Sequence, residues 1–136
     1  MGYLAVLLAA VAVFAFGAAW YGVLSKPWMT DSGVPVGDDG RPRNAASPVP
    51  YVTCFIALLL VAGMLRLLLE RIGPDGLFNA IQWGAAVGLF FITPWIALNN
   101  GYAMRSQRLT AIDGGYAVFG CAIAAAILYW LAPNAG

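Results

Sequence analysis

Three long stretches of the sequence contain no Asp, Glu, Lys or Arg: residues 2–25, 76–104 and 114–136. A fourth apolar run, residues 50–71, carries charge only towards its end, at Arg66, Glu70 and Arg71. A helix rises about 1.5 Å per residue, so roughly 20 apolar residues cross the hydrocarbon core of a bilayer. The length of these runs predicts four transmembrane helices.

The overall composition supports the same conclusion. Hydrophobic residues make up 62% of the 136 residues and charged residues only 10%, whereas a soluble domain carries about 25% charged residues. The net charge of +1 gives no basic surface for nucleic acid. We therefore predict one all-α domain, an integral membrane four-transmembrane-helix bundle whose surroundings are the lipid bilayer.

The breaks between the apolar runs set the expected helix boundaries. We expect helices at about 2–24, 50–71, 76–98 and 111–131, with a polar loop over 25–49 that is rich in Pro and Gly. In that loop, Asp39-Gly40 is a pair that favours a tight turn. Trp20, Tyr21 and Trp28 are side-chain types that favour a membrane interface.

The polar segment between the third and fourth helices predicts how those helices end. Pro94 leaves the carbonyl of Phe90 without its helical hydrogen bond, so we expect a kink there. Asn99 and Asn100 are expected to satisfy backbone groups at the helix terminus.

Helix starts can be predicted from side chains that accept hydrogen bonds from the first N–H groups. Asp75 is expected to cap the third helix in this way. Thr110 and Asp113 have the spacing of a capping box at the start of the fourth helix. The alternative for Asp113 is a proton or cation site, working with Asn99, Asn100 or Tyr116 at the same interface.

Arg66 and Glu70 are charged residues four positions apart on one face of the second helix. One interpretation is that Arg66 reaches the interface and pairs with Glu70. The other is that the charge lines a polar pathway through the membrane.

A stripe of small residues, Ala80, Gly84 and Gly88, follows one face of the third helix. Small residues let helix backbones approach closely in lipid. We predict that the stripe joins this chain to copies of itself or to a larger membrane complex; the alternative is a contact inside one subunit. Cys54 and Cys121 lie at different depths of their helices, so we expect two free thiols.

The sequence gives no sign of a catalytic centre. It contains no His, the residue most used as a general base and metal ligand. It also has no metal-ligand cluster and no nucleotide-binding glycine motif. We predict no catalytic, cofactor or metal site, and expect that the protein is not an enzyme.

Two stretches carry a family resemblance. One is Gly17-Ala-Ala-Trp20-Tyr21 followed by Lys26-Pro27-Trp28; the other is Arg105-Ser106 leading into Leu109-Thr-Ala-Ile-Asp113-Gly-Gly-Tyr116. Together they resemble the uncharacterised bacterial membrane proteins grouped as domain of unknown function 1761, over nearly the whole chain. The resemblance implies a four-helix integral membrane fold and brings no biochemical activity with it.

Three function classes follow from these features, and a membrane enzyme ranks last among them. The first is an accessory or assembly subunit of a membrane complex; the alternative is a small oligomeric transporter or channel. The resemblance suggests a bacterial inner membrane. Five of the seven basic residues fall in the first and third crossings, at Lys26, Arg41, Arg43, Arg105 and Arg108. By the positive-inside rule, both termini should face the periplasm or exterior.

Overall fold

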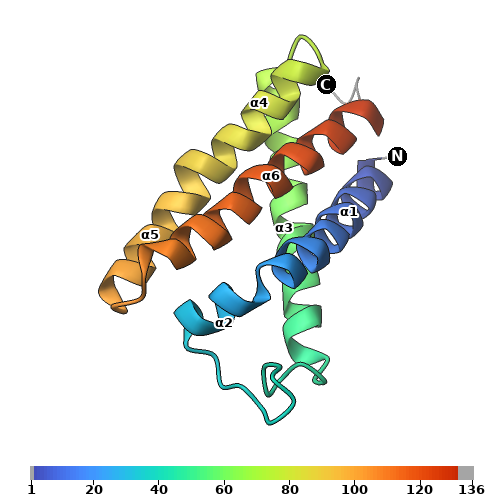
Figure 1. Cartoon of the computed structure of the whole chain (residues 1–136). Coiled ribbons are helices and arrows are strands. Elements are labelled where there is room, and N and C mark those ends of the chain that lie inside the picture. The colour runs from blue at the N-terminus through green and yellow to red at the C-terminus, as the bar shows by residue number, and fades with distance from the viewer. Residues whose placement is uncertain (1, 132–136) are drawn as a thin grey trace.

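The computed structural model of the chain describes residues 2–131. In chain order the helices are α1 (Gly2–Val23), α2 (Ser25–Ser32), α3 (Val49–Ile72), α4 (Leu77–Val87), the π-helix η1 (Gly88–Ile92), α5 (Thr93–Tyr102) and α6 (Gln107–Leu131). Figure 1 shows their arrangement. Four helical segments are long and apolar enough to cross a membrane, because α4, η1 and α5 form one continuous segment. The predicted all-α bundle of four spans is confirmed.

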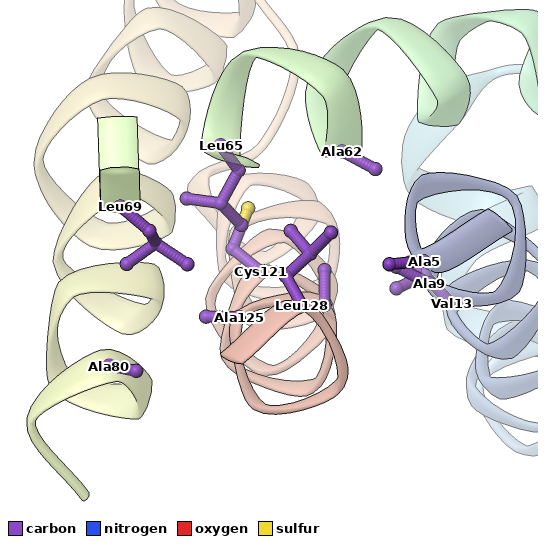
Figure 2. Close-up of a cluster of buried hydrophobic side chains, with 11 residues drawn as sticks. Ala5, Ala9, Val13, Ala62, Leu65, Leu69, Ala80, Cys121, Ala125 and Leu128 are labelled. Atoms are coloured by element: carbon purple, nitrogen blue, oxygen red, sulfur yellow. The ribbon is translucent and has the colours of Figure 1, made fainter. Parts of the chain in front are cut away.

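Helix α6 lies at the centre of the bundle. It has α4 and α5 on one side and α1 on the other, while α3 crosses behind at a steep angle (Figure 1). Figure 2 looks along this core, in which small and apolar side chains of α1, α3 and α4 surround α6. Ala9, Ala80 and Ala125 are fully buried, which is the close small-residue packing that holds helices together in lipid.

The small-residue stripe packs against α6 within the same chain. A Cβ atom added at Gly88 would lie 2.5 Å from the carbonyl oxygen of Ala117, and one at Gly84 would lie 2.6 Å from the Cβ of Ala125. These distances leave no room for any side chain. The predicted packing role of Ala80, Gly84 and Gly88 is confirmed. Their assignment to a contact between subunits is wrong, because α6 already covers the stripe.

The third span is longer than predicted and continues through Pro94 to Tyr102. At the predicted kink before Pro94 the structure has the π-helix η1, whose wider turn gives the Gly88 carbonyl two donors. The Thr93 N–H bonds to it, and the Thr93 hydroxyl donates to it at 2.7 Å. A π-turn inserts one extra residue, so the ring of Pro94 need not collide with a carbonyl one regular turn earlier.

The fourth span begins earlier than predicted, at Gln107. The hydroxyl of Ser106 accepts a hydrogen bond from the N–H of Leu109 at 3.3 Å, which is the position of a helix cap. Thr110 therefore lies inside the helix and is buried, so the predicted capping box of Thr110 and Asp113 is wrong. The predicted Asp75 cap is also wrong, because Gly76 occupies the cap position of α4 and no side chain bonds there.

The polar loop is more ordered than predicted. Its first third forms the short helix α2, which ends at Gly33 in a left-handed conformation with φ of 71°. Further on, Gly40 with φ of 77° makes the predicted tight turn, closed by a 2.8 Å bond from the Gly37 N–H to the Arg41 carbonyl. Cys54 and Cys121 are both free thiols, as predicted.

Candidate ligand-binding cavity

A line of polar contacts joins α1 to α6 near the end where α1 finishes and α6 begins. The indole N–H of Trp20 donates to the Ile112 carbonyl at 2.9 Å. The hydroxyl of Tyr21 donates to Oδ1 of Asp113 at 2.7 Å. One turn further into the membrane, the hydroxyl of Tyr116 donates to the Val13 carbonyl at 2.8 Å. We call these six residues the α1–α6 seam.

Glycines make this close approach possible. A Cβ atom added at Gly17 would lie 2.7 Å from the Tyr116 hydroxyl oxygen, and one at Gly115 would lie 2.8 Å from Cζ2 of Trp20. Each aromatic ring thus rests against a backbone that carries no side chain at that point. The two glycines belong to the sequence stretches that suggested the family, and this packing gives them a physical reason.

The seam is also the edge of an aromatic cluster. The Tyr21 ring meets Tyr116 edge to face at a centroid distance of 5.3 Å and meets Trp28 of α2 in the same way at 6.0 Å. Phe16 stacks on Tyr116 at 6.0 Å. Aromatic pairs at these distances are favourable beyond their buried area, so the cluster holds α1, α2 and α6 in register.

A cavity of about 620 Å³ opens beside the seam. This size falls within the range of small-molecule sites, which is roughly 300–1,000 Å³. The cavity exists because α3 crosses the bundle steeply and, among the described residues, does not pack against α5. It is lined by Ala10, Val13 and Tyr21 of α1, Trp28 of α2, Pro50, Tyr51, Cys54, Leu58, Val61 and Ala62 of α3, Ile92 and Ile96, and Asp113, Tyr116, Ala117, Gly120, Cys121 and Ala124 of α6.

The cavity has a polar end and an apolar end. Asp113, Tyr21, Trp28 and Tyr51 lie where α3 and α6 begin, whereas Ala62 and Ala124 lie far along these helices. Asp113 and Ala124 are eleven residues apart on α6, so the cavity extends about 16 Å along it. Such a shape suits a molecule with one polar end and an apolar body.

Asp113 is the acidic residue of the cavity. The ion pairs of residues 2–131 are Arg66 with Glu70 and Arg108 with Asp31, so no basic side chain in that range pairs with Asp113. Arg105 is the basic residue whose charge acts on it from a distance, and Arg105 is exposed. The carboxylate is half-buried and held in place chiefly by Tyr21.

A second ionic contact fixes α2 beside the cavity. Arg108 of α6 donates from Nε and Nη2 to the two carboxylate oxygens of Asp31, with the Nη2 bond at 2.9 Å. Hydrogen bonding by Arg108, with a smaller contribution from Ser106, lowers the pKa of the Asp31 carboxyl below its ordinary value. The pair holds α2, and with it Trp28, at the polar end of the cavity.

Of the charged residues singled out from the sequence, the pair on α3 lies elsewhere. Arg66 donates from Nε to Glu70 at 2.7 Å, which confirms the predicted ion pair. The guanidinium rests beside Gly2 at the start of α1, and neither residue lines the cavity. Of the predicted functional residues, only Asp113 and Tyr116 line the cavity.

The two adjacent asparagines, Asn99 and Asn100, differ in burial and in hydrogen bonding. Asn100 is buried with 3% of its surface exposed and donates from Nδ2 to the Thr110 hydroxyl at 3.0 Å. Asn99 is exposed. Both lie within α5 rather than at a free terminus, so the expected capping role is wrong. Asn100 instead ties α5 to α6 across the short turn between them.

Sequence reasoning missed the aromatic half of the site. Tyr21 and Trp28 were interpreted as interface residues, yet they face Asp113 from two other helices. Tyr51, exposed at the start of α3, also lines the cavity and was not singled out as a functional residue. The pairing of Tyr21 with Asp113 spans 92 positions, and nothing local in a single sequence marks such a contact. Gly17 and Gly115 were the available sequence signal that α1 packs closely against α6.

Comparisons with known proteins give one match. The family described as "Protein of unknown function (DUF1761)" matches residues 4–129. No curated protein matches the chain, and no solved structure does either. Among the described residues, no group of three or more Cys, Asp or Glu side chains is placed to hold a metal ion.

Proposed function

We propose, from the premise that the chain belongs to the DUF1761 family, whose function is unknown, that this protein binds an amphipathic small molecule inside the membrane. The observation that carries the proposal is the cavity of about 620 Å³ with Asp113 and Tyr21 at one end and alkyl side chains at the other. The proposed role is binding without catalysis.

The cavity favours the transporter class over the accessory subunit. Ligand sites in membrane proteins lie between helices, and polar groups within spans mark the ligand pathway. The accessory role was expected because the sequence showed few polar groups inside the spans. The α1–α6 seam places such groups beside the cavity. Assembly with copies or partners stays a prediction, because the stripe that suggested it is used within the subunit.

Location and orientation complete the proposal. We place the protein in the bacterial inner membrane, with both termini on the periplasmic side. In this orientation the polar end of the cavity lies towards the cytoplasm, because Lys26, Arg105 and Arg108 belong to the crossings at that end.

The proposal is tested by binding of a net-neutral amphipathic probe, decyldimethylamine N-oxide. The protein is reconstituted in phosphatidylglycerol nanodiscs, and binding of the radiolabelled probe is measured by flow dialysis with empty nanodiscs subtracted. We expect saturable binding at one site per chain. The absence of saturable binding would contradict the proposal.

A pair of matched substitutions locates the site. Ala117→Phe places a ring into the cavity lining of α6 and should abolish saturable binding. Ala57→Phe makes the same change at an exposed position of α3 outside the cavity lining and should leave binding unchanged. Equal binding by both variants would place the probe elsewhere, for example at the lipid-facing surface.

A further inference from the structure

We propose that the ligand is a cation: an amine or quaternary ammonium with an apolar tail, whose head lies beside the Asp113 carboxylate among the aromatic side chains of the cavity. This inference rests on the proposed function and adds the chemical class of the ligand. It follows from the charge and the aromatic surroundings of the polar end of the cavity.

The Asp113 carboxylate lacks an internal counter-ion among residues 2–131. A half-buried carboxylate in an apolar setting is unfavourable unless it is paired. Asp113 accepts a hydrogen bond from Tyr21, but within residues 2–131 no Lys or Arg lies within ion-pair distance of it. Asp31 and Glu70, the other acidic residues of this range that are partly buried, are each paired with an arginine. A cationic ligand would supply the missing partner.

Aromatic side chains surround this carboxylate in the cavity. Tyr21, Trp28, Tyr51 and Tyr116 line the cavity together with Asp113, and Trp28 lies beside the carboxylate itself. The faces of Trp and Tyr rings attract cations, and groups of such rings are the recognised way to bind quaternary ammonium. An anionic ligand would meet the Asp113 carboxylate and be repelled.

The rest of the cavity is apolar. Beyond the seam the lining consists of Ala, Val, Leu and Ile side chains with two thiols, which offers no second charged group. A tail without charge fits this end, and the head must stay near Asp113. The ligand class is therefore amphipathic with one positive end.

The test compares three probes with the same decyl tail in phosphatidylglycerol nanodiscs: decyltrimethylammonium, the net-neutral decyldimethylamine N-oxide, and decyl sulfate. Binding is measured by flow dialysis with empty nanodiscs subtracted. We expect the cation to bind about tenfold more tightly than the N-oxide and decyl sulfate to bind more weakly than both.

Two variants connect the preference to its residues. Asp113→Asn removes the charge but keeps an oxygen that can accept the hydrogen bond from the Tyr21 hydroxyl. This variant should lose the preference for the cation while it still binds the N-oxide. Trp28→Leu removes the aromatic face on the short helix α2 and should weaken cation binding with the carboxylate in place. Asp38→Asn, at an exposed loop position, is the control and should bind as the wild type.

The outcomes separate this inference from the proposed function. Equal binding of cation and N-oxide by the wild type would overturn the cation inference and leave the proposed function standing. A preference that persists in Asp113→Asn would also overturn it. If no probe binds saturably, both proposals fail.

An ammonium head can come from a lipid or from a soluble amine. Nanodiscs that contain phosphatidylethanolamine distinguish these sources, since its ammonium would compete for the site. A weaker apparent affinity for decyltrimethylammonium in these nanodiscs supports the cation site with a lipid as its occupant. An unchanged affinity supports the site with a soluble lipophilic amine as its occupant.

Discussion

The hydroxyl of Tyr21 donates a 2.7 Å hydrogen bond to the carboxylate of Asp113, although the two residues lie 92 positions apart. One residue stands near the end of the first span and the other near the start of the last. Their contact draws α1 onto α6 and leaves α3 as the separate wall of the cavity. The hydrogen bond therefore joins two helices of the bundle and also holds the carboxylate of the candidate site.

The glycine contacts of the third span give a prediction about stability. Gly84→Leu would force a side chain into the backbone of α6 at Cys121, and overpacking of this kind costs about 1–3 kcal/mol or more. We expect a clear fall in the thermal unfolding midpoint in mild detergent, measured by size-exclusion chromatography after heating.

Gly63→Leu is the matched control for this prediction. A Cβ atom added at Gly63 on α3 meets nothing within 4 Å, so the same substitution should leave the midpoint nearly unchanged. If Gly84→Leu is as stable as Gly63→Leu and loses only a dimer band in crosslinking, the stripe is an assembly face after all.

The Asn100–Thr110 contact predicts coupling between α5 and α6. Each of Asn100→Ala and Thr110→Val removes the same buried hydrogen bond, so their effects on the free energy of unfolding should be less than additive. Measured couplings of this kind in a membrane protein average about 0.6 kcal/mol. Asn99→Ala, at the exposed neighbour, should be neutral. Strict additivity would mean that the bond does not form.

The Asp31–Arg108 pair predicts a dependence on acid pH. Because the folded-state pKa of Asp31 lies below its ordinary value, the ionised carboxylate stabilises the fold at neutral pH. This contribution is lost as the pH falls below about 4 and through the folded-state pKa. The thermal midpoint of the wild type should therefore fall more between neutral and acid pH than that of Asp31→Asn.

The comparison between variants separates the contribution of Asp31 from that of the other carboxylates in the chain. Asp38→Asn, in the exposed loop, should behave as the wild type. Parallel pH profiles for the wild type and Asp31→Asn would show that α2 is not held by this pair.

The orientation of the chain predicts the behaviour of fused reporters. Green fluorescent protein folds to its fluorescent form in the cytoplasm, whereas alkaline phosphatase is active in the periplasm. With both termini outside, a fusion after the last residue should be dark with the first reporter and active with the second. Fluorescence of the terminal fusion would reverse the orientation and place the polar end of the cavity on the periplasmic side.

Much of the fold could be predicted from hydrophobicity alone. Runs long enough to cross a bilayer predicted four spans, and the boundaries of α1 and α3 agree closely with 2–24 and 50–71. The third span ends later than the predicted residue 98 and the fourth begins earlier than the predicted residue 111, because tertiary contacts overrode local signals there. Thr110 has the spacing of a cap, yet the Ser106 hydroxyl caps the helix. The Thr110 hydroxyl instead accepts a hydrogen bond from the side-chain amide of Asn100.

The site could be predicted only in part for a similar reason. Asp113 and Tyr116 stood out as polar residues in an apolar run, and both line the cavity. Tyr21 and Trp28 could not be assigned to it, because aromatic residues near the ends of spans are expected at the interface in any case. The cavity itself arises from the crossing angle of α3, which no local pattern encodes.

The central claim is that the cavity holds the apolar part of a ligand, and photolabelling tests it most directly. The probe is decyldimethylamine N-oxide with a diazirine at the end of its tail, and adducts are mapped by peptide mass spectrometry. We predict labelling at deep cavity residues such as Ala62 and Ala124, reduced by excess unlabelled probe. Labelling confined to lipid-facing side chains such as Leu60 and Phe91, and unaffected by the competitor, would contradict the account.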